Sequence, residues 1–270
     1  MGNVNKEGVK AVKVLMIGDI VGRAGRRAVR KTIGNLKTKV DFIIANGENA
    51  AGGFGLTKKV VDELVGYGID LLTTGNHVWD NKEIFDFIED TDYVIRPHNY
   101  PSQTPGLGFK IIEKDNFKLG VINLIGRVYL GNFACPFQAA DKIINKLNNK
   151  TDAIIVDFHA EATSEKQALG KYLDGKVTAV LGTHTHVQTA DEKIFSKGTA
   201  YMTDVGFSGA SDSILGMDSE APIKKFLQQT PQKFKVGTGD TELSGVIIEV
   251  NKETRKAQAI KRIKRYQQNN

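Results

Sequence analysis

Residues 177–186, with the sequence VTAVLGTHTH, place an apolar run directly before a glycine and a His-x-His pair. Short apolar runs of this kind, bounded by glycine, are typical of strands that are buried on both faces of a sheet. In an open α/β sheet, ligands gather outside the carboxyl ends of the strands. The stretch therefore predicts a buried strand that delivers His184 and His186 to a site at one edge of a sheet.

Four further apolar runs end in polar, ligand-type side chains. They are VKVLMI (12–17) before Gly18 and Asp19, FIIAN (42–46) before Gly47, Glu48 and Asn49, IDLLTT (69–74) before Gly75, Asn76 and His77, and AIIVDF (153–158) before His159. Taken singly, each of these residues is as readily a turn or capping residue as a ligand. Their shared position after five strand-like runs favours one common site.

The segments between these runs have helical patterns, which gives a repeated strand-then-helix order. We expect helices near 24–36, 58–67, 81–89, 137–147 and 164–173, with a short strand that ends at residue 96. After residue 97 the pattern changes: 108–113 and 117–125 are predicted to form a hairpin, and 199–203, 243–250 and 257–263 are predicted to be strands. The order predicts an α/β fold of two mixed β-sheets, packed face to face and flanked by helices. Residues 99–107 and 204–216 are expected to be long irregular loops, the second at the rim of the site.

Length and composition fit one large domain. The chain has 270 residues, and we expect residues 1–11 to be a loose leader and 12–270 a single domain. No apolar stretch approaches the ~18 residues of a membrane span, and the start lacks a signal-peptide pattern. The only cysteine, Cys135, can form no internal disulfide and is interpreted as a packed side chain. These features predict a cytoplasmic protein that does not enter a membrane.

The chain carries a formal charge of +6, with much of the excess near the carboxyl terminus. The residues concerned are Lys252, Arg255, Lys256, Lys261, Arg262, Lys264 and Arg265. A solvated basic surface and an RNA-binding strip are both compatible with this run, and the first is the simpler interpretation.

The donor set at the strand ends consists of carboxylates, carboxamides and imidazoles, without a thiolate. Such donors suit Mn, Fe, Zn, Ni or Mg, and the imidazoles argue against a site for magnesium alone. In an extended segment, His184 and His186 would point to the same side, as two ligands of one site require. Seven candidate donors exceed the needs of one ion, so we expect two divalent metal ions. Paired ions of this kind occur in phosphatases and nucleases.

The order of these motifs resembles that of the calcineurin-like metallophosphoesterases, from Gly-Asp (18–19) to Gly-Thr-His-Thr-His (182–186). The chain departs from their general pattern, because Val21 replaces a histidine and Glu48 replaces a bridging aspartate. Together with Thr-Asp-Val-Gly (203–206), these departures resemble the YmdB-like branch, small bacterial phosphodiesterases that act on cyclic nucleotides. The resemblance spans almost the whole chain from residue 12 to about residue 263.

The resemblance implies the role of each residue. One metal would be held by Asp19, Glu48, Asn49 and His186, and a second by Glu48, Asn76, His159 and His184, so that Glu48 is the bridge. His77 matches the position of the proton donor in these enzymes, and histidine exchanges protons readily near neutral pH. We expect a metal-bridging hydroxide to attack phosphorus in a cyclic nucleotide, of the 2′,3′ and also the 3′,5′ type.

Two other functions remain open. The chain could be a regulatory or RNA-associated metal-binding protein with little turnover, or a metallohydrolase of another bond, such as an amidohydrolase. Amidohydrolases usually place a His-x-His pair early in the chain, whereas here it comes late. The sequence favours Fe or Mn, allows Zn, and leaves open homo-oligomer formation and the choice among phosphodiester substrates.

Overall fold

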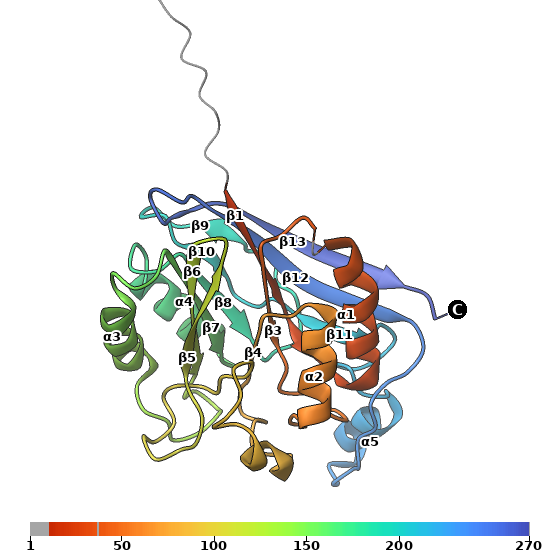
Figure 1. Cartoon of the computed structure of the whole chain (residues 1–270). Helices are drawn as coiled ribbons and strands as arrows, with labels where there is room; N and C mark the ends of the chain where they lie inside the picture. Colours follow the sequence, from red (N-terminus) through yellow and green to blue (C-terminus); the bar gives the residue numbers. More distant parts are fainter. Residues whose placement is uncertain (1–10, 37, 270) are drawn as a thin grey trace, which may run out of the picture.

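The five apolar runs that precede polar residues all form strands. They are β1 (Val12–Ile17), β3 (Phe42–Asn46), β4 (Leu71–Thr73), β7 (Ala153–His159) and β8 (Ala179–Thr183). The computed structural model describes residues 11–36 and 38–269, so residues 1–10 of the expected leader lie outside the described residues. Figure 1 shows that the strands are gathered between helices on two sides.

The first sheet has the order β2-β11-β12-β1-β3-β4, with β13 paired to β12. Its remaining strands are β2 (Asp19–Ile20), β11 (Phe207–Ala210), β12 (Thr241–Val250) and β13 (Ala257–Gln267). Strands β1, β3 and β4 are parallel, whereas β12 runs antiparallel to β1. Ile17 pairs with Ala45 and Asn46 with Thr73. This register places the segments that carry Asp19, Glu48 and Asn76 at the same edge.

The second sheet has the order β5-β6-β7-β8-β10-β9. It adds β5 (Phe109–Lys114), β6 (Phe117–Ile125), β9 (Lys193–Ile194) and β10 (Ala200–Met202). The predicted hairpin is confirmed: β5 and β6 pair antiparallel across Asp115 and Asn116, which both have positive φ, as tight hairpin turns require. Strands β6, β7 and β8 are parallel, and His159 pairs with Thr183, so His159 and His184 leave the sheet side by side.

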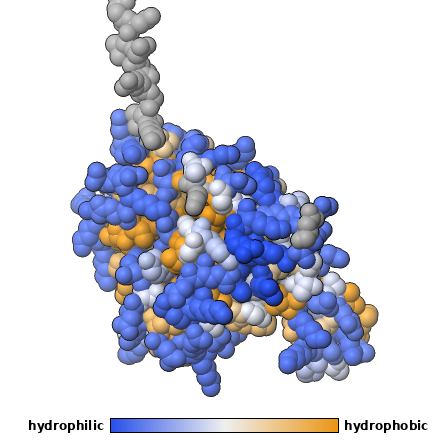
Figure 2. All heavy atoms as spheres, turned by 45° about the vertical axis from the view of Figure 1, so that its right-hand side comes forward, coloured by the Kyte–Doolittle hydropathy of each residue, from blue (hydrophilic) through white to orange (hydrophobic). Residues whose placement is uncertain are grey.

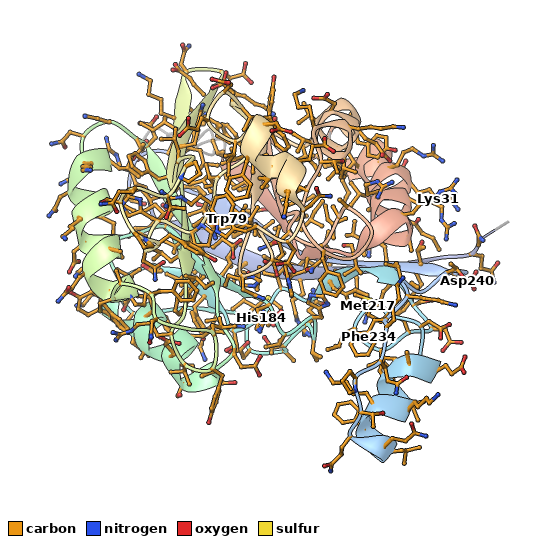
Figure 3. The ribbon with its side chains drawn as sticks, turned by 90° about the horizontal axis from the view of Figure 1, so that it is seen from below. Lys31, Trp79, His184, Met217, Phe234 and Asp240 are labelled. Atoms are coloured by element: carbon orange, nitrogen blue, oxygen red, sulfur yellow. The ribbon has the colours of Figure 1, made fainter. Side chains whose placement is uncertain are left out.

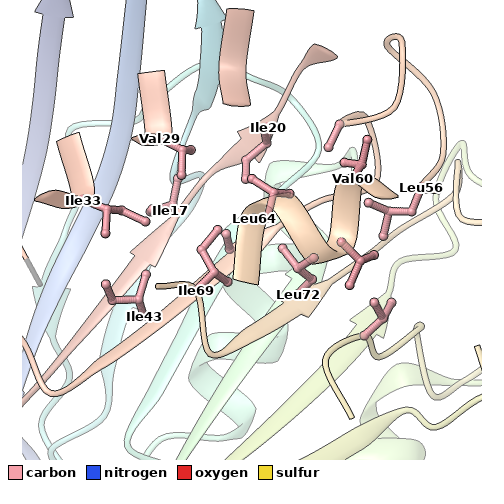
Figure 4. Close-up of a cluster of buried hydrophobic side chains, with 14 of the residues drawn as sticks. Ile17, Ile20, Val29, Ile33, Ile43, Leu56, Val60, Leu64, Ile69 and Leu72 are labelled. Atoms are coloured by element: carbon pink, nitrogen blue, oxygen red, sulfur yellow. The ribbon is translucent and has the colours of Figure 1, made fainter. Parts of the chain in front are cut away.

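Helices cover the outer face of each sheet. Helices α1 (Gly22–Leu36) and α2 (Lys58–Tyr67) pack on the first sheet, and α3 (Pro136–Leu147) and α4 (Thr163–Tyr172) on the second. Figure 4 shows Ile33 and Leu64 facing Ile17 and Ile43 in one outer core. A separate core, which includes Met16, Ile44, Val121, Ile155 and Val246, joins the two sheets. The predicted fold of two mixed sheets flanked by helices is confirmed.

Three local predictions were wrong. Residues 81–89 form only a short 3-10 helix (Lys82–Asp86), in which the N–H of Phe87 bonds three residues back to the carbonyl of Ile84. The strand expected to end at residue 96 is reduced to an isolated bridge between Leu72 and Val94. The segment 204–216 is not wholly irregular, since it contains β11, which pairs with β2 and β12.

A further helix, α5 (Glu220–Gln228), was missed by the sequence analysis. Its apolar residues Ile223, Phe226 and Leu227 have the i, i+3, i+4 spacing of a helix, which was overlooked. They face solvent, and only Pro222 is buried. It projects from the body of the molecule below the first sheet (Figure 1). Within residues 11–36 and 38–269, no helix combines the length and the apolar character needed to cross a membrane.

Candidate metal centre

The polar residues that follow the strands converge at one edge of the two sheets. Glu48 and His159 are buried, and a hydrogen bond of 2.9 Å from the N–H of His77 to Glu48 Oε2 links the loops after β3 and β4. The N–H of His184 donates to Asp19 Oδ2 at 3.2 Å, which links the loops after β1 and β8. His159, at the end of β7, joins the two pairs of segments, because its ring lies 3.0 Å from Glu48 Oε1 and 3.9 Å from Asp19 Oδ1.

Four donor atoms surround a single point beside His159. Its Nε2 lies 2.9 Å from Asn76 Oδ1, 3.0 Å from Glu48 Oε1 and 3.0 Å from His184 Nδ1. Glu48, His159 and His184 each place one ligand atom within 4.8 Å of the others. An imidazole nitrogen carries at most one hydrogen, so it can donate to only one of its three neighbours. A cation among these atoms would use a lone pair from every one, so the donor set fits a divalent metal.

A second group lies around Asp19. Its Oδ1 is buried without a hydrogen-bond partner among the described residues and is 3.9 Å from His186 Nε2. Asn49 Oδ1 is likewise buried and unpartnered in the part of the chain that the structure describes. The amide is oriented by its Nδ2, which donates to the carbonyl of Gly53 at 3.0 Å. Buried polar atoms are normally hydrogen-bonded or bound to an ion. Both acceptors belong to residues predicted to hold the same ion, and both are available to bind a cation.

Glycine is required at position 75 because the backbone there passes close to His159 and Glu48. A Cβ atom at this position would lie 2.3 Å from His159 Nε2 and 2.5 Å from Glu48 Oε2. Both distances are well below van der Waals contact. Only glycine lets the backbone that carries Asn76 and His77 pass this close to the donors.

The prediction that the His-x-His segment is extended was wrong. Strand β8 ends at Thr183, and His184 and His186 have φ values of 99° and 63°. This left-handed backbone is held by Asp204, which accepts hydrogen bonds from the N–H and the hydroxyl of Thr185 at 3.0 and 2.8 Å. The turn directs His184 toward Glu48 and His159, and His186 toward Asp19.

Asp204 and Lys166 support the turn and were not predicted to do so. Lys166 Nζ on α4 lies 2.7 Å from Asp204 Oδ2, and both side chains are buried. Asp204 follows β10 much as the predicted ligands follow their strands, which is a signal that sequence reasoning could have used. Lys166 lies in an ordinary helical pattern, so nothing in the sequence marks it.

A buried chain of hydrogen bonds also orients His159. Its Nδ1 lies 2.9 Å from the Thr183 hydroxyl, which donates to Asp157 Oδ1 at 2.8 Å. If Nδ1 donates its hydrogen to the Thr183 hydroxyl, the other ring nitrogen, Nε2, is the atom that can bind a metal. Such outer partners commonly fix the tautomer and orientation of a metal-binding histidine.

The charges in the centre shift one another's proton affinities. Burial opposes ionisation of Glu48, but the neighbouring His159 outweighs it and lowers the pKa of Glu48 to about 2. Burial alone would lower the pKa of His159, yet Glu48 and Asp19 raise it to about 9. Burial and the positive charge of His159 lower the pKa of His184 to about 3. At neutral pH, His184 is therefore unprotonated and able to bind a cation.

His77 lies at the mouth of the centre. Its Nδ1 lies 2.8 Å from Asp80 Oδ2, and its ring meets that of Phe54 edge-on, with 4.9 Å between the ring centres. Since Asp80 holds Nδ1, the other ring nitrogen, Nε2, is left to exchange a proton with a bound molecule.

The centre opens into a cleft of about 430 Å³. Glu48, Asn49, His77, His184 and His186 line one end of it, and the loop 214–217 and helix α5 line the other. Figure 3 places Met217 and Phe234 between His184 and α5. The volume is within the range usual for small-molecule sites, roughly 300 to 1,000 Å³.

Comparison with known proteins gives consistent matches over the whole fold. A family model described as YmdB-like protein matches residues 15–263. A 2′,3′-cyclic-nucleotide 2′-phosphodiesterase of Bacillus subtilis (strain 168) is 52% identical over 254 residues, which cover 93% of this chain and 96% of that protein. Two solved structures have a TM-score of 0.90. A hypothetical protein from Thermus thermophilus is 40% identical, covering 95% of this chain and 100% of its own, and a novel phosphatase from Mycoplasma pneumoniae is 34% identical, covering 97% and 95%.

Proposed function

The chain belongs to the YmdB-like family, and from this premise we propose that it hydrolyses the 2′,3′-cyclic phosphodiester of a nucleotide at a centre of two divalent metal ions. It is a phosphodiesterase, the class of its relative that is 52% identical. The observation that carries the proposal is the convergence of three donor atoms, from Glu48, Asn76 and His184, on His159 Nε2, beside the unpartnered carboxylate oxygen of Asp19.

Two overlapping donor sets would hold the ions. We assign Asp19, Glu48, Asn49 and His186 to one ion, and Glu48, Asn76, His159 and His184 to the other. The two groups of contacts around Asp19 and around His159 support this division. When bound, such ions supply Lewis acidity, which activates water and offsets charge on phosphoryl oxygens. The mixed carboxylate and imidazole set favours Fe or Mn and also accommodates Zn.

The residues of the chain would position the substrate and supply a proton to the leaving group. Water attacks phosphorus, a new P–O bond forms, and the bond from phosphorus to the 2′-oxygen breaks. The water loses one proton to solvent, and His77 donates one to the departing 2′-oxygen, so the product is a 3′-phosphate. Asp80 holds the His77 ring through Nδ1 at 2.8 Å. A 3′,5′-cyclic nucleotide would be a slower second substrate, because its six-membered ring is less strained.

The experiment is a substrate series with metal-stripped protein reloaded with Mn²⁺ or Fe²⁺. The substrates are 2′,3′-cyclic AMP, 3′,5′-cyclic AMP and bis(p-nitrophenyl) phosphate. We expect metal-dependent turnover, fastest with 2′,3′-cyclic AMP. The variant His77→Gln should lose about 10²- to 10⁴-fold in kcat on the cyclic nucleotide. It should lose far less on the aryl ester, because nitrophenolate leaves without a proton.

A control variant separates this chemistry from general damage. His98→Gln changes another half-buried histidine, which packs against Phe109 and does not line the cleft, and it should retain wild-type rates on all three substrates. Protein that binds two ions per chain but turns over none of the substrates would contradict the proposal. That result would favour a regulatory metal-binding protein instead.

A further inference from the structure

The two ends of the cleft differ in chemistry. The floor carries the carboxylates, amides and imidazoles of the metal centre, whereas the opposite wall is formed mostly by apolar side chains. The wall includes Leu215, Met217, Phe226 and Phe234, and Phe54 adjoins the floor, where it packs against His77. A cyclic phosphodiester is polar throughout, so its hydrolysis alone gives no reason for an apolar wall beside the centre.

The wall is supplied by separate segments. Phe226 on α5 is 79% exposed, and Phe54, which follows β3 and adjoins the floor, is 39% exposed beside His77. Phe234 follows α5 and packs with Met217 and Val21 at the base of the wall. Lys225 Nζ lies 5.3 Å from the centre of the Phe234 ring and also lines the cleft. Exposed aromatic rings beside one polar cation form the kind of surface on which a flat heterocycle stacks.

We propose that this wall is a nucleobase subsite, in which the base of the substrate stacks on the aromatic side chains while the cyclic phosphate lies at the metal centre. This inference rests on the proposed function, because that function fixes the phosphate at the floor. The base is the only part of a nucleotide with broad apolar faces, and the cleft continues from the floor to the wall without interruption. Lys225 would meet the polar edge of the base.

Two neighbouring residues of helix α5 distinguish a base bound in the cleft from a partner that covers the outer surface of the helix. Phe226 and Leu227 are neighbours and are equally exposed, at 79% each, but only Phe226 lines the cleft. Figure 2 shows apolar side chains on the outer surface of the projecting lobe that carries α5. A partner that covered this lobe would depend on Leu227 as much as on Phe226. A base in the cleft would depend on Phe226 alone.

The experiment compares Phe226→Ala with the matched control Leu227→Ala. Each metal-loaded protein is assayed on 2′,3′-cyclic AMP and on methyl β-D-ribofuranoside 2,3-cyclic phosphate, which has no base. Stacking of a base on an aromatic side chain contributes ~1–3 kcal/mol. We therefore expect kcat/KM for the nucleotide to fall about tenfold or more in Phe226→Ala, mainly through KM. Rates on the base-free substrate, and all rates of Leu227→Ala, should be unchanged.

Binding of the product separates this proposal from the proposed function. Calorimetry with adenosine 3′-phosphate and with ribose 3-phosphate measures the subsite even in a protein without turnover. Tighter binding of the nucleotide that is lost in Phe226→Ala supports the subsite, whatever the rates. The proposal is overturned if wild-type protein binds both phosphates equally. It is also overturned if Phe226→Ala and Leu227→Ala lose activity together, with a change in oligomeric state by sedimentation.

Discussion

The floor and the wall of the cleft are built in opposite ways. The floor consists of side chains at the ends of paired strands, where Asp19, Glu48 and His159 are almost wholly buried and held by their neighbours. The wall consists of side chains on α5 and on loops, which are exposed apart from Met217 and Phe234 at its base, and little of α5 is buried. Residues that must hold ions and transfer protons are thus fixed by sheet register. Residues that would select a substrate stand on segments that can change without disturbing the sheets.

The largest effect is expected at the floor, in Glu48→Gln. The substitution keeps the shape of the side chain but removes the charge that both donor sets share. Loss of an outer partner of a metal ligand typically costs 10- to 100-fold, so loss of a bridging ligand should lower kcat/KM by about 10³-fold or more. Metal content by mass spectrometry and steady-state rates on 2′,3′-cyclic AMP measure it. Glu249→Gln is the control, since Glu249 pairs with Lys13 near the start of β1, at the end away from the centre.

Wild-type activity and full metal content in Glu48→Gln would contradict the comparison between a fixed floor and an adaptable wall. Glu48 would then be a structural residue, and neither donor set as assigned could be correct. The circular dichroism spectrum of the variant must match that of wild type, because a misfolded protein would lose activity for another reason.

The next effect concerns the support beneath the floor. Lys166→Met leaves Asp204 buried without its cation, and breaking a buried pair from one side costs about 3–5 kcal/mol. Chemical denaturation should show this loss in the free energy of unfolding. Lys176→Met is the control, because Lys176 and Asp141 form an exposed pair, and exposed pairs contribute about 0–1 kcal/mol. Equal destabilisation by the two variants would contradict the assignment of Lys166 to the support of the His-x-His turn.

A smaller effect follows from the proton on His159. Its pKa of about 9, against an ordinary 6.5, means that metal-free protein carries a proton there at pH 7.5, and a binding metal must displace it. Metal affinity should rise by about tenfold per pH unit between pH 7 and 9. Proton release is measured by calorimetry in buffers of different ionisation enthalpy. A metal affinity independent of pH over this range would show that His159 binds no ion.

The same shift has a consequence for metal-free protein. Because the folded state raises the pKa of His159, the stabilisation is complete below about pH 6.5 and is lost as the pH rises through about 9. Metal-free protein should therefore become less stable between these values. Metal-loaded protein should not follow this trend, since the ion replaces the proton.

The floor was largely predictable from sequence, because strands and their polar ends are local signals. Apolar runs predicted β1, β3, β4, β7 and β8, and the residues after them proved to be neighbours in space. The turn at His184 was not predictable, because its positive φ depends on Asp204 and Lys166, which are distant in sequence. The interpretation of the basic tail as a solvated surface stays a prediction. Strand β13 brings Arg262 and Lys264 to Glu192 and Glu242, so part of its charge is paired.

The position of the wall was not predictable, because the i, i+3, i+4 apolar residues Ile223, Phe226 and Leu227 would be expected to face a core, whereas they are exposed. This low burial of α5 gives the smallest effect. Helices with few buried contacts open with free energies far below that of global unfolding. By hydrogen exchange, the amides of α5 should exchange on the order of 100-fold faster than those of β7, which is buried throughout. At saturation, adenosine 3′-phosphate should slow exchange in α5 by roughly 5- to 150-fold, since a stacked base contributes ~1–3 kcal/mol, whereas ribose 3-phosphate should not. If α5 is protected as strongly as β7 in free protein, the wall is as rigid as the floor, and the division between a fixed centre and an adaptable wall fails.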